Sequence, residues 1–149
     1  MNRLLRSLFI LLPLLLVGSW ACAQTSKGVV QRGLDAYVNT DASGAVKAWL
    51  KGSALETDPR ATSQANALRQ VEDFYGKVES YQLIAEYEVS ERSRMVYFVV
   101  HYAKGPAFGR MLVYRTASGE WVSTEFRFNT DAAQVFPPQL AIGNKQSSS

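Results

Sequence analysis

The chain has 149 residues, of which 47% are hydrophobic and 19% charged, with a formal net charge of +3, one histidine and one cysteine. One histidine and one cysteine are too few for a structural zinc site, and the acidic residues lack the spacing of a calcium-binding loop. The sequence also has no glycine-rich phosphate loop and no dinucleotide fingerprint, so we expect neither a metal nor another cofactor.

The first 23 residues have the pattern of a cleavable secretory signal peptide. Arg3 and Arg6 precede an apolar run over residues 8–17, interrupted only by Pro13. This run has about ten residues, whereas a transmembrane helix needs roughly 20. The pattern therefore predicts export without a permanent transmembrane anchor.

The cleavage site is predicted immediately before Gln24. Ala21 and Ala23 place small residues at the two positions that a signal peptidase reads. Cys22 raises the alternative of a lipoprotein, since a cysteine after an apolar run can carry a lipid anchor. The preceding residues lack the aliphatic side chain that is usual three positions before such a cysteine, which favours ordinary cleavage. We expect a periplasmic or secreted protein, with a lipoprotein anchored at Cys22 as the alternative.

The charge of the mature chain argues against a nucleic-acid partner. Without Arg3 and Arg6, 14 basic residues face 13 acidic ones, which leaves a net charge of +1. Both signs are scattered along the chain, whereas a nucleic-acid-binding protein gathers its cations in a stripe or patch.

Residues 26–75 have the apolar spacing of amphipathic helices. Polar capping residues and glycines mark the expected ends. The predicted helices are Lys27 to Val38, a second between its cap at Thr40 or Asp41 and Gly52, and a third from its cap at Asp58 to Tyr75.

Residues 80–128 alternate between apolar and polar side chains, as strands do. The predicted strands are roughly Ser80 to Val89, Met95 to Tyr102, Arg110 to Arg115 and Trp121 to Phe128. Short turns between consecutive strands predict an antiparallel meander, one face of which must pack on the helices. We expect one α+β domain over residues 24–138, three N-terminal helices on a four-stranded sheet, followed by a disordered tail over 139–149.

This order of elements, ending in the aromatic strand Trp121 to Phe128, resembles the nuclear transport factor 2-like (cystatin-like) cone fold. The resemblance is one of architecture and not of a specific motif. It implies a curved sheet wrapped around a long helix, with a pocket at the open end. Some members of this group are enzymes and many are non-catalytic binding or dimerisation modules, so the fold does not fix the function.

His101 is the first candidate for proton transfer, because histidine titrates near neutral pH. The alternative, which we favour, is a histidine at the end of a strand with only a structural role. A catalytic role requires a cavity beside His101 and a second polar group within hydrogen-bond reach.

The last strand offers a second candidate site. Strict alternation places Trp121, Ser123, Glu125 and Arg127 on one face and residues such as Val122 on the other. If the Val122 face meets the helices, Glu125 and Arg127 are exposed and pair across strands, which is the alternative we favour. If the Trp121 face instead lines a pocket, Glu125 and Arg127 lie in a region of low dielectric constant. The candidate pocket or sheet-face residues are Tyr97, His101, Arg110, Tyr114, Trp121, Glu125 and Arg127.

Two functions fit these observations. The first is an exported non-enzymatic module that binds a small ligand, a peptide or a second copy of itself through its sheet face or cone pocket. The alternative is a small cofactor-free isomerase or hydrolase that uses His101 or Glu125 as a proton shuttle.

Overall fold

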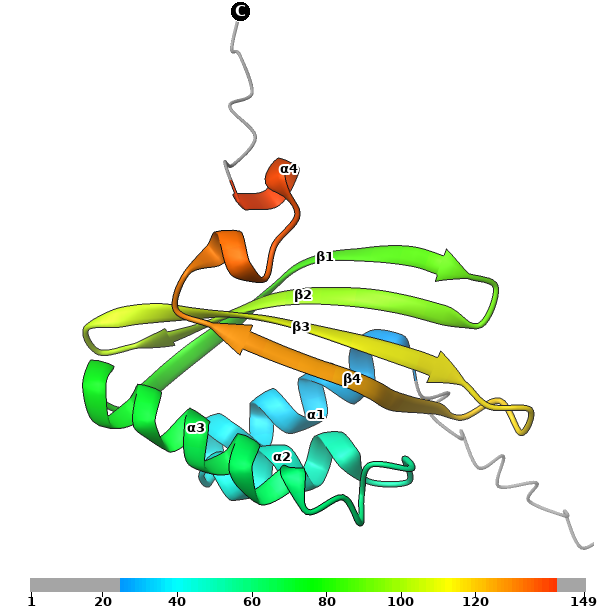
Figure 1. Ribbon diagram of the computed structural model, residues 1–149, viewed down its shortest axis with the longest axis horizontal. Coiled ribbons are helices and arrows are strands. Elements are labelled where there is room, and N and C mark those ends of the chain that lie inside the picture. Colours follow the sequence, from blue (N-terminus) through cyan, green and yellow to red (C-terminus); the bar gives the residue numbers. More distant parts are fainter. Residues whose placement is uncertain (1–24, 142–149) are drawn as a thin grey trace, which may run out of the picture.

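A computed structural model describes residues 25–141, which form one antiparallel sheet with helical segments on both of its faces (Figure 1). The four strands follow one another across the sheet in chain order. They are β1 (Val78–Ser90), β2 (Ser93–Tyr102), β3 (Gly105–Arg115) and β4 (Trp121–Asn129). The predicted α+β class and antiparallel sheet are confirmed, whereas the proposed signal peptide lies outside the described residues.

Three helices lie beneath the sheet in Figure 1, and two short helical segments lie above it. The lower ones are α1 (Ser26–Asn39), α2 (Ala42–Leu50) and α3 (Arg60–Tyr75). The upper ones are the 3-10 helix η1 (Ala132–Gln134) and α4 (Pro138–Ala141). None of these helices is both long and apolar enough to cross a membrane.

Local sequence signals set the helix ends. Asp41, one of the two predicted caps of α2, accepts a hydrogen bond from the Gly44 backbone N–H at 2.7 Å. Asp58 accepts one from the Arg60 N–H at 2.9 Å and so supports the start of α3. Gly76 has φ of +85°, a conformation that favours glycine, and it ends α3 where the sequence predicts.

The main core lies between the sheet and the lower helices. Trp49 of α2 packs against Phe126 and Phe98, with ring centroids 4.6 and 6.1 Å away, and its Nε1 donates to the Val30 carbonyl at 2.9 Å. Gly33 of α1 lies so close to the indole that an added Cβ would be 2.2 Å from it. Aromatic side chains therefore fill this layer, and a side chain at position 33 would not fit beside the indole.

Two buried tyrosines join the helices to β2. The Tyr37 and Tyr102 hydroxyls lie 3.0 Å apart, and the Tyr37 hydroxyl also donates to the Leu68 carbonyl at 3.2 Å. Burial raises the pKa of Tyr102 to about 12 and raises the pKa of Tyr37 as well. Both groups are therefore neutral at physiological pH and act as hydrogen-bonding core residues.

The opposite face of the sheet, which we call the outer face, is partly covered by the C-terminal segment. The Phe136 ring lies 5.6 Å from that of Tyr97 and 5.3 Å from that of Phe108, both edge to face. Leu140 of α4 packs against the same cluster. The disordered tail was expected from residue 139, but residues 139–141 belong to α4. Residues 142–149 lie outside the described part of the chain.

A β-bulge in β4 changes the faces that strict alternation predicts. Ser123 and Glu125 pair with adjacent residues of β3, so Thr124 is the extra residue. Ser123 is buried on the helix side, where its Oγ donates to the Trp49 carbonyl at 2.8 Å. The prediction that Trp121 and Ser123 share a face with Glu125 is wrong, because alternation does not continue across a bulge.

The turn between β2 and β3 is shorter than the predicted turn over residues 104–106. β3 already begins at Gly105, and Pro106 pairs with His101. Proline is tolerated near the first residue of a strand, where the loss of one N–H donor disrupts the ladder least.

Candidate functional site

The seven candidate residues divide between the two faces of the sheet. The register and the alternation of the strands place six of them on the outer face and Trp121 on the helix side. The six are Tyr97, His101, Arg110, Tyr114, Glu125 and Arg127.

His101 does not converge with Glu125. His101 pairs with Pro106 and Glu125 with Leu112. These two partners are six steps apart along β3, which is about 20 Å at 3.3 Å per residue. His101 is exposed and lines none of the depressions described below, so the arrangement that a shared proton shuttle requires is not assembled.

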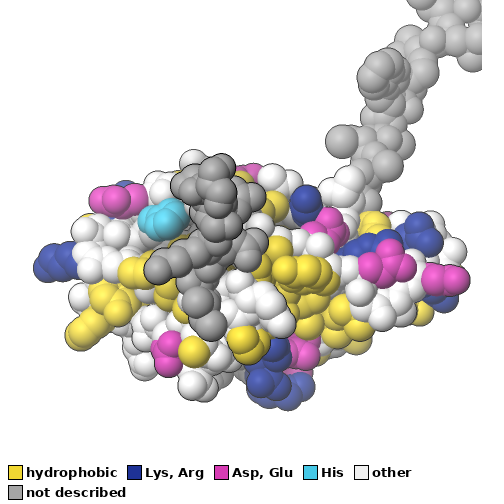
Figure 2. Space-filling view, turned by 90° about the horizontal axis from the view of Figure 1, so that it is seen from above, with side chains coloured by type: hydrophobic (Ala, Val, Ile, Leu, Met, Phe, Trp, Pro, Cys, Tyr) yellow, Lys and Arg dark blue, Asp and Glu magenta, His cyan; other side chains and the backbone are white. Residues whose placement is uncertain are grey.

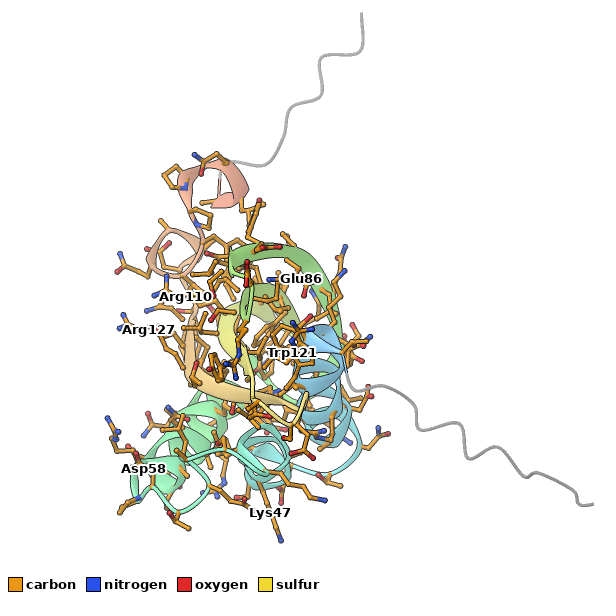
Figure 3. All side chains as sticks on the ribbon, turned by 90° about the vertical axis from the view of Figure 1, so that its right-hand side faces the viewer. Lys47, Asp58, Glu86, Arg110, Trp121 and Arg127 are labelled. Carbon is orange, nitrogen blue, oxygen red and sulfur yellow. The ribbon has the colours of Figure 1, made fainter. Side chains whose placement is uncertain are left out.

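Tyr97 and Trp121 pack against other side chains of the fold. Tyr97 is buried beneath Phe136 as part of the C-terminal cluster. Trp121 lies between the guanidinium groups of Arg94 and Arg115, each 5.8 Å from its ring centroid. Trp121 packs against the main core on the helix side of the sheet, so it lies apart from Arg110 and Arg127 of the outer face, as Figure 3 shows.

Arg110, Glu125 and Arg127 form an ionic cluster on the outer face. Arg110 Nη2 lies 3.2 Å and Arg127 Nε 2.9 Å from the same Glu125 oxygen, Oε1. Figure 3 shows both arginines on the same side of the sheet. These side chains are partly exposed, at 27% for Arg110, 35% for Glu125 and 65% for Arg127, and so remain reachable. The Arg110–Glu125 pair joins β3 to β4, whereas the Arg127–Glu125 pair lies within β4. The expectation that Val122 lies on the face opposite to Glu125 and Arg127 is wrong, because Val122 pairs with Tyr114 on the outer face.

The contacts within this cluster do not pair all the hydrogen-bond donors of the Arg110 guanidinium. Among the residues that the structure describes, its Nε is buried and has no hydrogen-bond partner. A single contact from Nη2 uses one of the five N–H donors that a guanidinium offers. Buried donors are normally paired, so this Nε is an exception among the described residues.

Arg92 brings a third cation to the outer face. Its guanidinium carbon lies 4.7 Å from the centroid of the Tyr114 ring, and its Nε donates to the Arg115 carbonyl at 2.8 Å. Sequence reasoning missed Arg92, because it lies in the turn between β1 and β2, where strand alternation assigns no face.

We call the open half of this surface the outer patch. Its members lie beyond the cluster formed by the C-terminal segment; all but Arg92 point outward from strands, and Arg92 reaches the face from the turn by stacking over Tyr114. They are Tyr87, Arg92, Arg110, Leu112, Tyr114, Val122, Glu125 and Arg127. Three arginines against one carboxylate give the patch a net charge of +2. Figure 2 looks onto the outer face, where hydrophobic side chains gather in the middle and the histidine lies toward the opposite end from most of the charged residues.

A groove follows the free edge of β4 where this strand passes α3. One depression of about 460 Å³ is bounded by Gln64 and Ala67 of α3 and by Arg127 of β4. A second, of about 330 Å³, continues past Phe74, whose ring is 75% exposed. The groove therefore borders the outer patch at Arg127 but has its own walls.

The described residues offer no assembled metal centre. Over residues 25–141, no three side chains of the types His, Cys, Asp or Glu come together as metal ligands would.

No protein-family model matches the chain, and no curated protein matches it. Among solved structures, the chain is similar to the crystal structure, at 1.27 Å resolution, of a DUF4783 family protein from Bacteroides uniformis ATCC 8492. The two are 12% identical with a TM-score of 0.46, and the similarity covers 70% of this chain and 94% of that one. At this level the similarity carries no information about what this chain binds.

Proposed function

We propose that this protein is an exported, non-enzymatic interaction module that binds a polypeptide partner through the outer patch. The observation that carries the proposal is a sheet face left half open. The C-terminal segment covers the cluster around Tyr97, and the adjoining Leu112, Tyr114 and Val122 have no such cover among residues 25–141.

The composition of the patch is that of a protein-binding surface. Tyrosine and arginine are among the residue types that most often dominate the energy of interfaces, and the patch holds both beside half-buried aliphatic side chains. Tyr114 is already held by Arg92, so it loses little side-chain entropy when a partner docks.

The inner side of the sheet is a weaker candidate. We infer a nuclear transport factor 2-like fold, because helices cover one face of a four-stranded antiparallel sheet. In that group the pocket lies between helix and sheet. Here Trp49, Phe98 and Phe126 fill that space, so a ligand would have to displace core side chains.

Export is the second part of the proposal, and it follows from the sequence of residues 1–23. Mass spectrometry of the protein from the cells that make it tests this part. The expected N-terminal residue is Gln24, and an acylated Cys22 would instead establish a lipoprotein.

The enzymatic alternative depends on His101 or Glu125. Because His101 is exposed and distant from Glu125, we expect His101→Gln to leave partner binding unchanged. Loss of binding in this variant, with folding intact, would restore His101 as a functional residue.

Site-specific photo-crosslinking in the producing cells tests the binding proposal. A photoreactive amino acid replaces Tyr114 in one variant and Gln31, an exposed residue of the helical layer, in the matched control. The expected result is a discrete adduct with another polypeptide from position 114 only. Equal adducts from both positions, or none from position 114, would refute the proposed function.

A further inference from the structure

We infer that the outer patch recognises an extended, acidic segment of its partner, in which two carboxylates flank an apolar side chain in the order acid–x–apolar–x–acid. This inference rests on the proposed function and specifies the chemistry of the partner. It follows from the charge of the patch, from the spacing of its side chains along β3 and from the unpaired donors of Arg110.

The charge of the patch selects an acidic partner. Arg92, Arg110 and Arg127 face one carboxylate, that of Glu125, which already accepts from both Arg110 and Arg127 through one oxygen. An arriving carboxylate would neutralise a net positive surface and accept from the partly exposed guanidinium of Arg110.

The same charge argues against a second copy of this chain as the occupant. A two-fold axis through the patch would bring two surfaces together that each carry a net charge of +2. Like charges that face each other in an interface are repulsive, and only one carboxylate per copy is present to offset them. A self-complementary contact is therefore electrostatically disfavoured here.

The spacing along β3 sets the order of side chains in the partner. Arg110, Leu112 and Tyr114 alternate outward on this strand, and Arg92 lies over Tyr114. Positions 110 and 114 are about 13 Å apart at 3.3 Å per residue, the span of residues i and i+4 in an extended segment. Residues i, i+2 and i+4 of such a segment point to one side, so two acids would meet Arg110 and Arg92 while the apolar residue between them meets Leu112.

The shape of the surface favours a polypeptide over a small organic acid. A pocket for a small molecule encloses most of its ligand, whereas the patch is one open sheet face whose three cations come from two strands and a turn. An extended segment reaches both ends of this face, from Arg110 to Arg92.

Fluorescence anisotropy with defined peptides tests the inference. The probe is a labelled heptapeptide, Gly-Glu-Ser-Leu-Ser-Glu-Gly, added to the purified protein at low ionic strength. One comparison peptide replaces both Glu residues by Gln, and another places them two residues apart. We expect the probe to bind at least tenfold more tightly than either comparison peptide and to weaken as salt is added.

Matched double variants locate the charge effect. Arg110→Gln with Arg127→Gln should weaken binding of the probe at least tenfold. Lys47→Gln with Arg69→Gln removes the same charge from exposed positions of α2 and α3 and should change binding less than twofold. The inference is wrong if the two double variants bind alike, or if the Gln peptide binds as well as the probe.

Amide shift mapping by NMR separates the inference from the proposed function. If the Gln peptide shifts the signals of Leu112 and Tyr114 as strongly as the probe does, the patch is a binding surface without acidic specificity, and only the inference fails. If the probe shifts residues of the groove beside α3 instead, the inference and the use of the outer patch both fail. No binding of any peptide overturns the inference, and the crosslink at position 114 then decides the proposed function.

Discussion

The two faces of the sheet are built from the same alternating strands, yet they differ in what covers them. The inner face meets three helices, and its side chains, such as Met111 and Val113, are fully buried. The outer face meets a short C-terminal segment over one half only, and Leu112 between those two residues remains partly exposed. Neighbouring positions of one strand therefore differ in burial, and the proposed function assigns recognition to the outward ones.

The two faces also differ in whether their polar groups have hydrogen-bond partners. On the inner face, the Ser123 hydroxyl and the tyrosine pair each have hydrogen-bond partners, as buried polar groups must. On the outer face, Arg110 keeps an unpaired Nε among the described residues. This nitrogen is buried although the Arg110 side chain as a whole is 27% exposed.

The largest loss of stability is expected from a variant that removes a large side chain from the core beneath the inner face. Trp49→Ala removes the indole from between α1 and β4 together with its hydrogen bond to Val30. We expect it to cost roughly 3–5 kcal/mol of unfolding free energy, measured by urea denaturation. A cost below about 1 kcal/mol would mean that the helices and the sheet do not share one core.

The pH dependence of stability tests the same core. Burial holds the pKa of Tyr102 near 12, above its unfolded value near 10, so its neutral form stabilises the fold below pH 10. That stabilisation, roughly 3 kcal/mol from the shift in pKa, should be lost as the pH rises from 10 to 12. Tyr102→Phe should flatten the decline, and an unchanged decline would assign it to other groups.

An intermediate effect is expected where the C-terminal segment meets the outer face. Phe136→Ala removes a ring that packs on Tyr97 and Phe108. Its transfer free energy is about 2 kcal/mol, and thermal unfolding should show a loss of that size. Peptide binding at the outer patch should persist, and its loss would mean that the segment helps to shape the patch.

The smallest effect on stability is expected within the outer patch. Arg110→Gln breaks a partly exposed ion pair, which is worth at most about 1 kcal/mol. Calorimetry should therefore show almost unchanged unfolding, while probe binding falls. A large loss of stability would place Arg110 in the structural framework rather than in the recognition surface.

The sequence predicts the elements of this fold well because the signals for them are local. Asp41 caps a helix and Gly76 ends one through interactions with near neighbours in the chain. The faces of β4 were not predictable by alternation, because the bulge at Thr124 depends on pairing with β3. The cover over Tyr97 was missed for a similar reason, since Phe136 reaches it only through tertiary packing.

The candidate site was predicted in part. Arg110, Glu125 and Arg127 were named from the period of the strands, and the structure brings these three together. Trp121 was grouped with them by the alternation that the bulge interrupts. Arg92 was missed because its position depends on stacking over Tyr114 across strands.

Two variants of adjacent residues, Met111→Ala and Leu112→Asp, test the separation of the two faces most directly. For each variant, the free energy of unfolding and the crosslinking yield from position 114 are measured. Met111→Ala should lose roughly 2–5 kcal/mol of stability and still crosslink under conditions where it is folded. Leu112→Asp should remain within about 1 kcal/mol of the unaltered protein and lose the adduct. If stability and crosslinking fall together in both variants, the outer patch is part of the structural core and the account is wrong.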